Sequence, residues 1–531
     1  MYLGHEWTLL LAEHKSAGAL LIGDQEATAI LQIAERYEQV VVWCASSEDE
    51  GRLRAELKGF TDEVSISAVR PADLIARLST LPTTFSLVVF SDVRNRYGKS
   101  VAYKLADTVE KGLSVGGQLL VRVGIRLGLK NLLRNPLDSF GRPRLRALTG
   151  RCEKAGFGHT QHLYPYPENQ LSKEYLGFGR IQKTPEESLF GRILNGLGAG
   201  RLGFNFVLVL SSRELQTPRV ARIAAQGSKG ASDVMIQRFI VRSNGIVVAL
   251  FTSSESDAVL KIALHDAAKQ RIHASAEAAQ RVSNRSVHLA HLIPRQIDSG
   301  RSHGFAYSIE TQCQGLPAVQ VMKDASSVET VHRTVLNFLV SFGDTGSSSS
   351  GSRNGDDLVR RYVSPVIDGF PELESELTKL GEKLTSTLGE SRLRSVHAHG
   401  DFNPSNVFLS RGGQDITGII DWDAENENGV PATDLLHFVL ASTKRRRSRA
   451  LGNRVVACLD GVEFSASESS LLSDYMRSFG IRESNLPVLI VLYWLNHICV
   501  HLKYKRQSLP VSWVKDNLVD PLDAMLRMSW R

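Results

Sequence analysis

The stretch HGDFNPSNVFLSRGGQDITGIIDWD, from His399 to Asp423, decides the fold of the second half of the chain. Its apolar segments VFL and GII, separated by the turn-rich RGGQD, indicate the two strands of a β-hairpin. Asn406 comes directly before the first strand, and Asp421 directly follows the second. Because the strands of a hairpin lie side by side, we expect the side chains of Asn406 and Asp421 to converge on one point.

The residue types in this stretch suit phosphoryl transfer. That reaction needs Mg²⁺ held by hard oxygen ligands and a carboxylate beside the attacking hydroxyl. Asp401 is the candidate that orients the hydroxyl and accepts its proton, and Asn406 and Asp421 are the candidate metal ligands. Asp423 is expected to reach a second metal ion or the substrate. His399, counted with Asp401 among the catalytic candidates, is expected to brace the loop by hydrogen bonding rather than to transfer protons.

A lysine earlier in the chain fits the same chemistry. Lys261 stands in AVLKIAL, a predicted strand in which its neighbours are apolar. A buried lysine is costly unless it is paired, and Glu277, in a predicted helix 16 residues later, is the expected partner. In kinases such an ion pair directs the ammonium group at the phosphates of ATP. The alternative is an edge-strand lysine and a helix glutamate that both face water.

HGDFNPSN followed by IIDWD resembles the signature of the aminoglycoside phosphotransferase / choline kinase superfamily, and the similarity extends over roughly residues 235–531. The resemblance implies an α+β protein-kinase-like fold of two lobes. It also implies ATP and Mg²⁺ as cofactors and a small-molecule hydroxyl as the acceptor. One departure is the turn RSNGIVV, in which Gly245 is the single glycine where the family covers the phosphates.

Two further segments carry this resemblance. SIETQCQG, Ser308–Gly315, resembles the hinge between the lobes, where backbone groups would meet adenine. GVPATDLLHF places Asp434 where the family has a helix-borne aspartate that steadies the catalytic loop. The predicted cofactor-binding residues are therefore Lys261, Glu277, Glu310 and Asn406.

The chain has 531 residues, which is long for one ordinary domain. Residues 1–215 alternate Val-, Leu- and Ile-rich segments with helical ones, which predicts a Rossmann-like α/β domain with a mostly parallel sheet. Residues 216–330 are predicted as a kinase-like N-lobe with antiparallel strands, and residues 331–531 as a helical C-lobe. The Gly/Ser-rich segment 343–357 is predicted as a flexible insertion within that lobe.

The first half resembles the fold of S-adenosylmethionine-dependent methyltransferases. LLIGD, Leu20–Asp24, stands where such folds bind the cofactor, and residues 162–177 resemble a segment of methyltransferase-like proteins from surface-polysaccharide pathways. Two departures argue against S-adenosylmethionine as a cofactor: Gly23 is the single glycine of the first turn, and the acid expected after strand two is delayed to Glu48. A degenerate domain that packs on the kinase or binds a partner is the favoured interpretation.

Charge, cysteine content and apolar segments limit the expected ligands and location of the protein. The net charge of +7 is mild for this length and fits anionic ligands such as nucleotides, while nucleic acid is not the expected partner. The five cysteines form no C-x-x-C pair, which suits a reducing, cytoplasmic location. The apolar segment 486–500 is interpreted as a buried helix that is too short to span a bilayer, so no membrane insertion is expected. The oligomeric state stays open.

The leading hypothesis is an ATP-dependent kinase that phosphorylates a hydroxyl of a small molecule, with a sugar or glycan intermediate as the preferred class. Antibiotic phosphorylation stays open, because acids in FPELESE and WDAENENG would suit a polycationic aminoglycoside. One alternative is a bifunctional methyltransferase–kinase of surface-polysaccharide synthesis. Another is a pseudokinase scaffold without catalytic activity.

Overall fold

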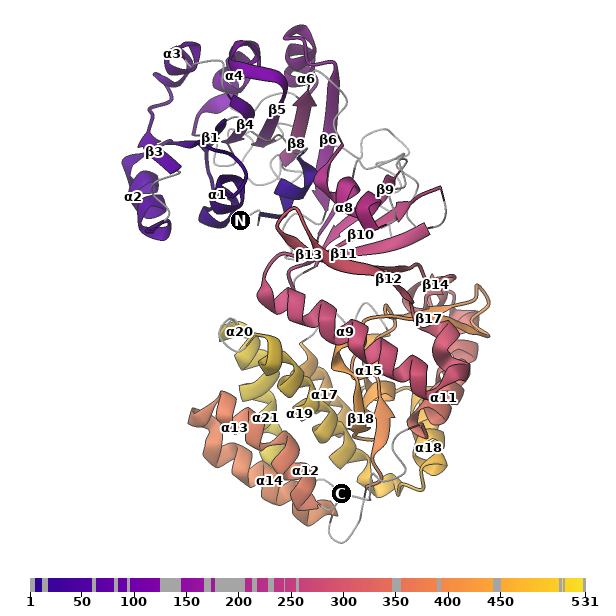
Figure 1. The fold of residues 1–531 in the computed structure, drawn as a ribbon. Helices are drawn as coiled ribbons and strands as arrows, with labels where there is room; N and C mark the ends of the chain where they lie inside the picture. The colour runs from indigo at the N-terminus through magenta and orange to yellow at the C-terminus, as the bar shows by residue number, and fades with distance from the viewer. Residues whose placement is uncertain are drawn as a thin grey trace. The chain divides into compact units, whose positions relative to one another are not determined.

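The computed structural model describes residues 5–11, 18–59, 64–80, 85–92, 96–124, 145–166, 173–176, 206–212, 217–227, 234–242, 244–254, 257–345, 355–388, 393–442, 450–505, 509 and 511–528. The predicted insertion 343–357 falls mostly outside these residues. The chain divides into two compact units (Figure 1). The first contains Met1–Lys269 and Gln296–Thr311, and the second contains Gln270–Arg295 and Gln312–Arg531.

The first unit begins with a parallel sheet covered by helices on both faces. Alternate residues of strand β1 enter different cores: Leu21 lies in the cluster that contains Ile30 of α1, and Leu20 lies in the cluster that contains Leu105 of α4. This arrangement confirms the predicted Rossmann-like α/β fold. The parallel strands, in the order β3-β2-β1-β4-β5, are β1 (Gly18–Gly23), β2 (Val40–Cys44), β3 (Val64–Ala68), β4 (Phe85–Asp92) and β5 (Leu113–Gly124). The helices are α1 (Ala27–Ala34), α2 (Ser47–Glu56), α3 (Leu74–Ser79), α4 (Gly98–Gly112) and α6 (Leu145–Lys154).

Beyond β5 the sheet continues with antiparallel strands. Strand β8 (Phe206–Ser212) lies between β5 and β6 (His159–Tyr166) and is antiparallel to both. Strand β7 (Lys173–Leu176) pairs with β6 and also with β9 (Met235–Val241). Strand β9 opens an antiparallel meander, which continues through β10 (Ile246–Thr252), β11 (Asp257–Ala263), β13 (Phe305–Thr311) and β12 (Gln296–Ser302). Antiparallel strands were predicted for this region, but β12 was not among them. Within the described residues, all these strands join into one 13-stranded sheet.

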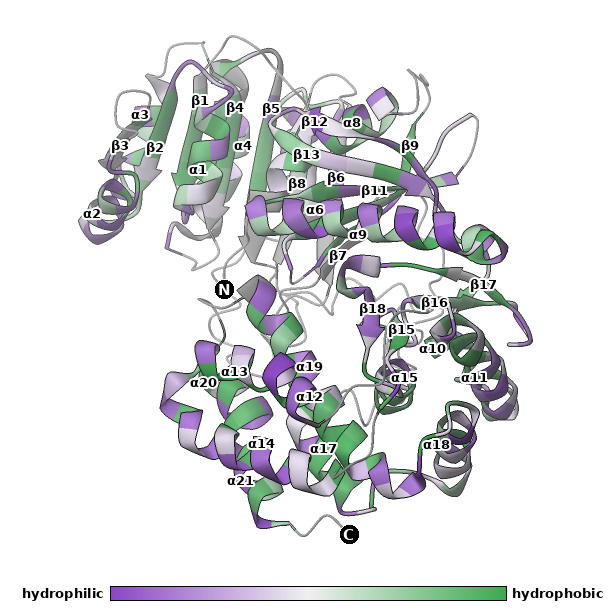
Figure 2. Cartoon of the chain, turned by 60° about the horizontal axis from the view of Figure 1, so that its bottom comes forward, coloured by the Kyte–Doolittle hydropathy of each residue, from purple (hydrophilic) through white to green (hydrophobic). Residues whose placement is uncertain are grey.

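The two parts of this sheet also share a core. The predicted boundary between residues 215 and 216 lies between β8 and helix α8 (Arg219–Gly227). Leu21 of the parallel part and Phe239 of the meander nevertheless belong to one hydrophobic cluster, which also contains Ile223 of α8. Hydrophobic residues are present on strands of both parts of the sheet (Figure 2).

The second unit is mainly helical. This agrees with the helical character predicted for residues 331–531. Its helices are α9 (Asp266–Arg285, from Gln270 onward), α10 (Ala318–Val321), α11 (Val328–Gly343), α12 (Gly355–Tyr362), α13 (Ser364–Gly369), α14 (Glu374–Leu388), α15 (Thr433–Ala441), α17 (Leu451–Leu459), α18 (Ala466–Ser478), α19 (Leu486–Lys505), α20 (Val511–Val514) and α21 (Asp520–Arg527). With the meander of the first unit, this confirms the α+β, kinase-like fold class.

Short strands in the second unit build the predicted hairpin. Strands β16 (Val407–Leu409) and β17 (Ile416–Ile419) are antiparallel, and Val407 lies opposite Ile419. Strand β14 (Leu316–Pro317) adds to the free edge of β16. Strand β15 (Val396–Ala398) pairs with β18 (Asn426–Gly429). Since β15 leads into the loop from His399 and β18 follows Asp423, these pairings hold both ends of the quoted stretch.

Helix α19 is the apolar segment near the end of the chain. It is long and apolar enough to cross a membrane by length and composition, so the expectation that the segment is too short is corrected. The expectation of a buried helix agrees with its central residues, because Val491, Leu492 and Leu495 are 0% exposed. These residues belong to the large helical core of the second unit.

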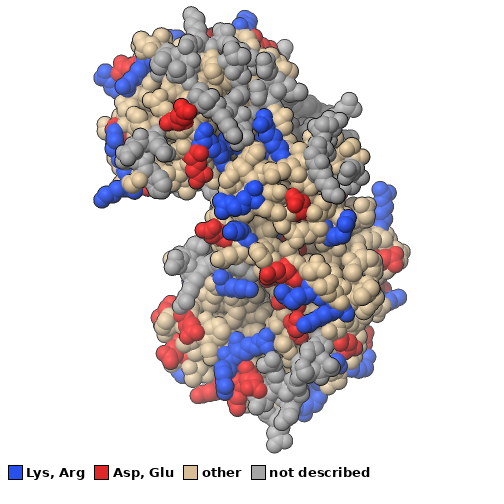
Figure 3. All heavy atoms as spheres, viewed as in Figure 1, with Lys and Arg blue, Asp and Glu red and all other residues tan. Residues whose placement is uncertain are grey.

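Charged side chains of both signs are distributed over the face shown in Figure 3. Lysine and arginine lie next to aspartate and glutamate in several places on this face. The chain has 63 basic and 56 acidic residues, and on this face the basic side chains do not form one continuous patch.

A glycine substitution tests how tightly the turn after β1 closes on β4. Gly23 has φ +91°, and an added Cβ would collide with the carbonyl oxygen of Ser91. We expect Gly23→Ala to lower the free energy of unfolding by about 1–3 kcal/mol or more, because strain and collision add. Chemical denaturation monitored by circular dichroism measures this change. Gly51→Ala, in α2 with nothing within 4 Å of the added carbon, is the matched control and should cause no loss.

Candidate active site

The loop after β15 is fixed by a buried carboxylate from helix α15. Asp434, which is 6% exposed, accepts hydrogen bonds from the backbone N–H groups of His399 (2.6 Å) and Gly400 (2.9 Å). Burial raises the pKa of Asp434, although His399 and the two N–H bonds partly offset this effect. Asp434 therefore steadies this loop, as the sequence predicted.

His399 connects the loop to the strand that precedes Asp421. Its imidazole is fully buried, and Nε2 lies 3.1 Å from the carbonyl oxygen of Ile420. Because that carbonyl can only accept, Nε2 carries the proton, and Nδ1 accepts the backbone N–H of Asp401 (3.3 Å). The ring also packs against Trp422, with centroids 4.5 Å apart. These contacts support the predicted bracing role of His399.

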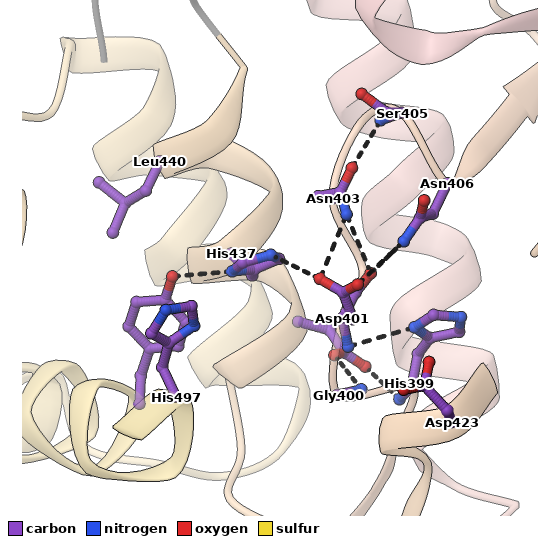
Figure 4. Close-up of polar contacts among 12 residues, drawn as sticks. His399, Gly400, Asp401, Asn403, Ser405, Asn406, Asp423, His437, Leu440 and His497 are labelled. Atoms are coloured by element: carbon purple, nitrogen blue, oxygen red, sulfur yellow. Dashed lines mark hydrogen bonds and ion pairs between the residues drawn. The ribbon is translucent and has the colours of Figure 1, made fainter. Parts of the chain in front are cut away.

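The carboxylate of Asp401 stands at the centre of the loop (Figure 4). Oδ1 accepts hydrogen bonds from Asn403 Nδ2 (3.2 Å) and His437 Nε2 (3.0 Å), and Oδ2 accepts one from Asn406 Nδ2 (3.2 Å). Burial acts to raise the pKa of Asp401, but the hydrogen bonds that its carboxylate accepts from His437 and Asn403 hold it below its ordinary value. Asp401 is therefore ionised near neutral pH, as a proton acceptor must be.

Asn406 is 4% exposed, and its amide nitrogen points at Asp401. The oxygen of the same side-chain amide therefore points away from Asp401. Its backbone carbonyl accepts the N–H of Ile420 (3.0 Å), which brings the residue before Asp421 alongside Asn406. Asp421 itself has φ 65°, an uncommon backbone conformation for a residue with a side chain, and such strain occurs most often at functional sites.

The donor atoms fit Mg²⁺. An amide oxygen from Asn406 and a carboxylate from Asp421 are hard oxygen ligands, which Mg²⁺ prefers. Among the described residues there is no group of three or more His, Cys, Asp or Glu side chains placed to hold a metal ion. This ligand set suits Mg²⁺, because protein-bound Mg²⁺ usually takes one or two protein ligands and completes its shell with substrate phosphates and water.

Asp423 has a different partner from the one predicted. Arg271 of α9 donates to Asp423 Oδ2 from Nε (2.8 Å) and Nη2 (2.7 Å). Burial raises the pKa of Asp423, the arginine opposes this rise, and the charges of Asp421 and Asp401 add to it. Asp401 and Asp421 thus both lie close enough to Asp423 for their charges to act on it. Arg271 supplies the counter-charge, because a carboxylate buried beside two others needs a cation. A contact of Asp423 with a second metal ion or the substrate stays a prediction.

Further arginines of α9 bind the acids that follow Asp423. Arg281 bonds to Glu425 (2.8 Å), and Arg285 bonds to Glu427 (2.6 Å). Ser275 of the same helix accepts the backbone N–H of Trp422 (3.1 Å). The acids of WDAENENG are therefore neutralised by α9, and they do not form the open acidic wall that would bind a polycation.

In the first unit, Lys261 has a carboxylate partner on a neighbouring strand. Its Nζ lies 2.6 Å from Oε1 of Glu310, and Lys261 is 8% exposed. Glu277 instead lies on an exposed part of α9, 3.3 Å from His273 one turn earlier. The expectation that Glu277 pairs with Lys261 is thus corrected. The register of β11 and β13 explains the change: Lys261 faces Ser308 directly, so Glu310, two residues on, is its diagonal neighbour on the same face.

The turn that resembles a methyltransferase cofactor site is closed by protein contacts. The N–H of Asp24 donates to the carbonyl oxygen of Ser91 (2.9 Å), and an added carbon at Gly23 would meet that oxygen. Asp49, at the start of α2, pairs with Arg96 and bonds to Ser46. No acidic group in the described part of this unit directly follows β2, so we derive no step through S-adenosylmethionine.

His437 was missed by the sequence analysis. It lies on α15, three residues after Asp434, and so on the same face of that helix. Its Nδ1 is 2.9 Å from the hydroxyl of Tyr493 on α19, and its Nε2 contacts Asp401 (Figure 4). The three-residue spacing in TDLLHF was the available signal, because it places His437 toward the loop that Asp434 binds.

The comparisons with known proteins agree with this geometry. Residues 246–459 match the family model described as the phosphotransferase enzyme family. No curated protein matches the chain by sequence.

Several solved structures are similar to parts of the chain. Aminoglycoside phosphotransferase APH(3'')-Id from Streptomyces rimosus, in complex with ADP and streptomycin, is 15% identical; the match covers 52% of this chain and 97% of that one, with a TM-score of 0.34. WbdD with a kinase inhibitor is 11% identical, with coverage of 88% and 85% and a TM-score of 0.26. The N-methyltransferase NodS from Bradyrhizobium japonicum is 14% identical, with coverage of 39% and 93% and a TM-score of 0.25.

The ion pairs of Glu425 predict a specific loss of stability in acid. Burial acts to raise the pKa of Glu425, but His397 and Arg281 hold it below its ordinary value. The unfolded state then binds more protons, so this stabilisation is present above about pH 4.3 and is lost as pH falls through the depressed pKa. We expect Glu425→Gln to be less stable than wild type near neutral pH and the two to converge in acid.

Urea denaturation from about pH 7 down to about pH 2, well below the ordinary glutamate pKa of about 4.3, measures this difference. Glu382→Gln, at an exposed position of α14, is the matched control and should follow the wild type at every pH. A constant gap between Glu425→Gln and wild type would contradict the assignment.

Proposed function

We propose that this protein is an ATP-dependent phosphotransferase that moves the γ-phosphoryl group of ATP to a hydroxyl group of a small molecule. One observation carries the proposal. Asp401 is held ionised beside Asn406, with Asp421 just beyond the paired strand, which is the set of groups that in-line phosphoryl transfer requires. The match of residues 246–459 to the phosphotransferase enzyme family supports it.

In the proposed reaction, the acceptor oxygen attacks the γ-phosphorus and its proton passes to Asp401. The bond from the γ-phosphorus to the β–γ bridging oxygen breaks, and ADP leaves. Asn406 and Asp421 would hold Mg²⁺, which when bound neutralises the developing phosphate charge. His399 and Asp434 keep the loop in place.

We further propose Lys261, Glu277, Glu310 and Asn406 as the residues that contribute to nucleotide binding. Lys261 is presented by β11 with Glu310 as its counter-charge. A lysine held in this way keeps its charge although it is buried, and it suits the phosphates of ATP. This chemistry would take place in the cytoplasm, where ATP is available.

A sugar or glycan intermediate is our preferred class of acceptor. The support is the first unit, whose sequence resembles methyltransferase-like proteins of surface-polysaccharide pathways. The α9 arginines give a second reason, because they neutralise Asp423, Glu425 and Glu427 and so leave fewer acids for a polycationic antibiotic. A bifunctional methyltransferase–kinase remains the second candidate, and the parallel sheet of the first unit is the observation that favours it.

Ligand-induced stabilisation separates these functions. A ligand that binds only the folded protein raises its melting temperature by mass action. We expect Mg·ATP, but not S-adenosylmethionine, to raise the melting temperature of the full chain in differential scanning fluorimetry. A response to both ligands would favour the bifunctional enzyme, and a response to neither would favour the non-catalytic scaffold.

Two substitutions separate proton transfer from nucleotide binding. We expect Asp401→Ala to lower ADP release by about 10²- to 10⁴-fold while Mg·ATP binding is kept, because the proton acceptor is lost. Asp421→Ala should abolish Mg²⁺-dependent nucleotide binding, because a metal ligand is lost. A coupled assay for ADP and isothermal titration calorimetry measure the two quantities.

Asp415→Asn is the matched control, since Asp415 is exposed in the turn of the same hairpin. It should match the wild type in both assays. Near-normal turnover of Asp401→Ala would remove Asp401 as the proton acceptor.

A further inference from the structure

A hydrogen-bonded chain runs from the helical core of the second unit to the proposed proton acceptor. The hydroxyl of Tyr493 on α19 lies 2.9 Å from Nδ1 of His437 on α15. Nε2 of the same imidazole lies 3.0 Å from Oδ1 of Asp401. The side chain of His437 is 14% exposed and that of Asp401 is 37% exposed, so the chain ends at the more accessible group.

The chemistry of the three groups fixes the direction of this chain. An ionised carboxylate only accepts hydrogen bonds, so Nε2 of His437 must carry a proton. In a neutral imidazole Nδ1 is then an acceptor, and its partner must donate. Tyr493 can do so, because burial raises its pKa and keeps the hydroxyl protonated. Donation therefore runs from Tyr493 to His437 and from His437 to Asp401.

The bonds to Asp401 are distributed unequally between its two oxygens. Oδ1 accepts from both His437 and Asn403, while Oδ2 accepts from the Asn406 side chain. A carboxylate oxygen has about two lone-pair positions for hydrogen bonds. Oδ1 is thus filled by protein donors, and Oδ2 keeps a position for the hydroxyl proton of the acceptor.

We propose that His437, oriented by Tyr493, is a positioning residue for phosphoryl transfer: it occupies Oδ1 of Asp401 and so turns Oδ2 toward the acceptor hydroxyl. This inference rests on the proposed function, because it gives a role to the carboxylate that accepts the proton. His437 itself touches neither acceptor nor nucleotide in this scheme. It acts on the rotation of the Asp401 carboxylate.

A hydrogen bond from His437 to Asp401 and simple space-filling by His437 predict different effects of substitution. A histidine that only fills space could be replaced by any side chain of similar size. A histidine that positions Asp401 must keep a donor at the place of Nε2. Glutamine can place its amide nitrogen near that point, whereas leucine has the bulk without the donor.

The test compares His437→Leu with His437→Gln in the full chain. The probe is Mg·ATP with water as the acceptor, and ADP release is measured. We expect His437→Leu to lower kcat by roughly 10- to 100-fold, as is typical when a supporting hydrogen bond behind a reactive group is lost. KM for Mg·ATP should be unchanged, and His437→Gln should recover most of the lost kcat.

Tyr493→Phe removes only the donor to Nδ1 and should lower kcat less than His437→Leu does. Tyr475→Phe is its matched control: Tyr475 is equally buried in the helical core, but its hydroxyl bonds to the backbone of Ala432 rather than to His437. The control should keep the wild-type kcat. Equal kcat values for His437→Leu and wild type, or equal losses in the leucine and glutamine variants together with weaker Mg·ATP binding, would overturn the proposal.

A second readout needs no turnover. In ¹⁵N-histidine-labelled protein, ¹H–¹⁵N spectra report which imidazole nitrogen carries the proton, and the signal lost in His437→Gln identifies His437. We expect protonated Nε2 and unprotonated Nδ1 in the wild type, and a changed Nδ1 signal in Tyr493→Phe. A wild-type His437 protonated at Nδ1 alone would overturn the proposal even if the enzyme is active. Conversely, a wild type that neither binds Mg·ATP nor releases ADP would refute the proposed function. The spectra would still show whether His437 donates from Nε2 to Asp401.

Discussion

The candidate site depends on one buried carboxylate, that of Asp434, which holds the backbone of His399 and Gly400. The two bonds attach the start of the loop to the N-terminal turn of helix α15, and this attachment restricts the position of Asp401 two residues later. A charged group is costly to bury, and here the cost is met by backbone donors that the loop would otherwise leave unsatisfied. Everything nearer to the reacting atoms, from the His399 brace to the Asn406 amide, builds on this attachment.

A second set of charges aligns helix α9 with the segment after Asp421. Arg271, Arg281 and Arg285 each meet one acid of that segment, and Ser275 binds its backbone. The acids occupy every second position of a segment that runs from a short 3-10 helix (Trp422–Ala424) into strand β18, while the arginines recur on a helix. The two repeats match because each arginine side chain is long enough to span the difference. As a result, the chain that follows Asp421, the proposed metal ligand, is held by ion pairs rather than by apolar packing alone.

Much of the fold and part of the site could be predicted from the sequence. The strand–helix alternation of the first half and the hairpin between Asn406 and Asp421 follow from local patterns, while the role of Asp434 was implied by the family resemblance. The partner of Lys261 could not be read in this way, because it depends on the register between β11 and β13, which brings Glu310 rather than Glu277 to the same face. The arginine partner of Asp423 was missed for a similar reason: it comes from a helix 152 positions away in sequence. His437 was also missed, although its three-residue spacing from Asp434 places it on the same face of α15; its contact with Tyr493 depends on the packing of α15 and α19, which no local pattern gives.

The continuous sheet of the first unit has a consequence for anyone who wishes to shorten the chain. One edge of strand β9 is paired with β7. Phe239 and Val247 of the meander belong to the same hydrophobic cluster as Leu21 and Ile30. Cutting before residue 216 would bare a strand edge and an apolar face at once, and such surfaces associate with one another in water. The antiparallel strands with which the phosphotransferase-family match begins are thus not detachable from the parallel part of the same sheet.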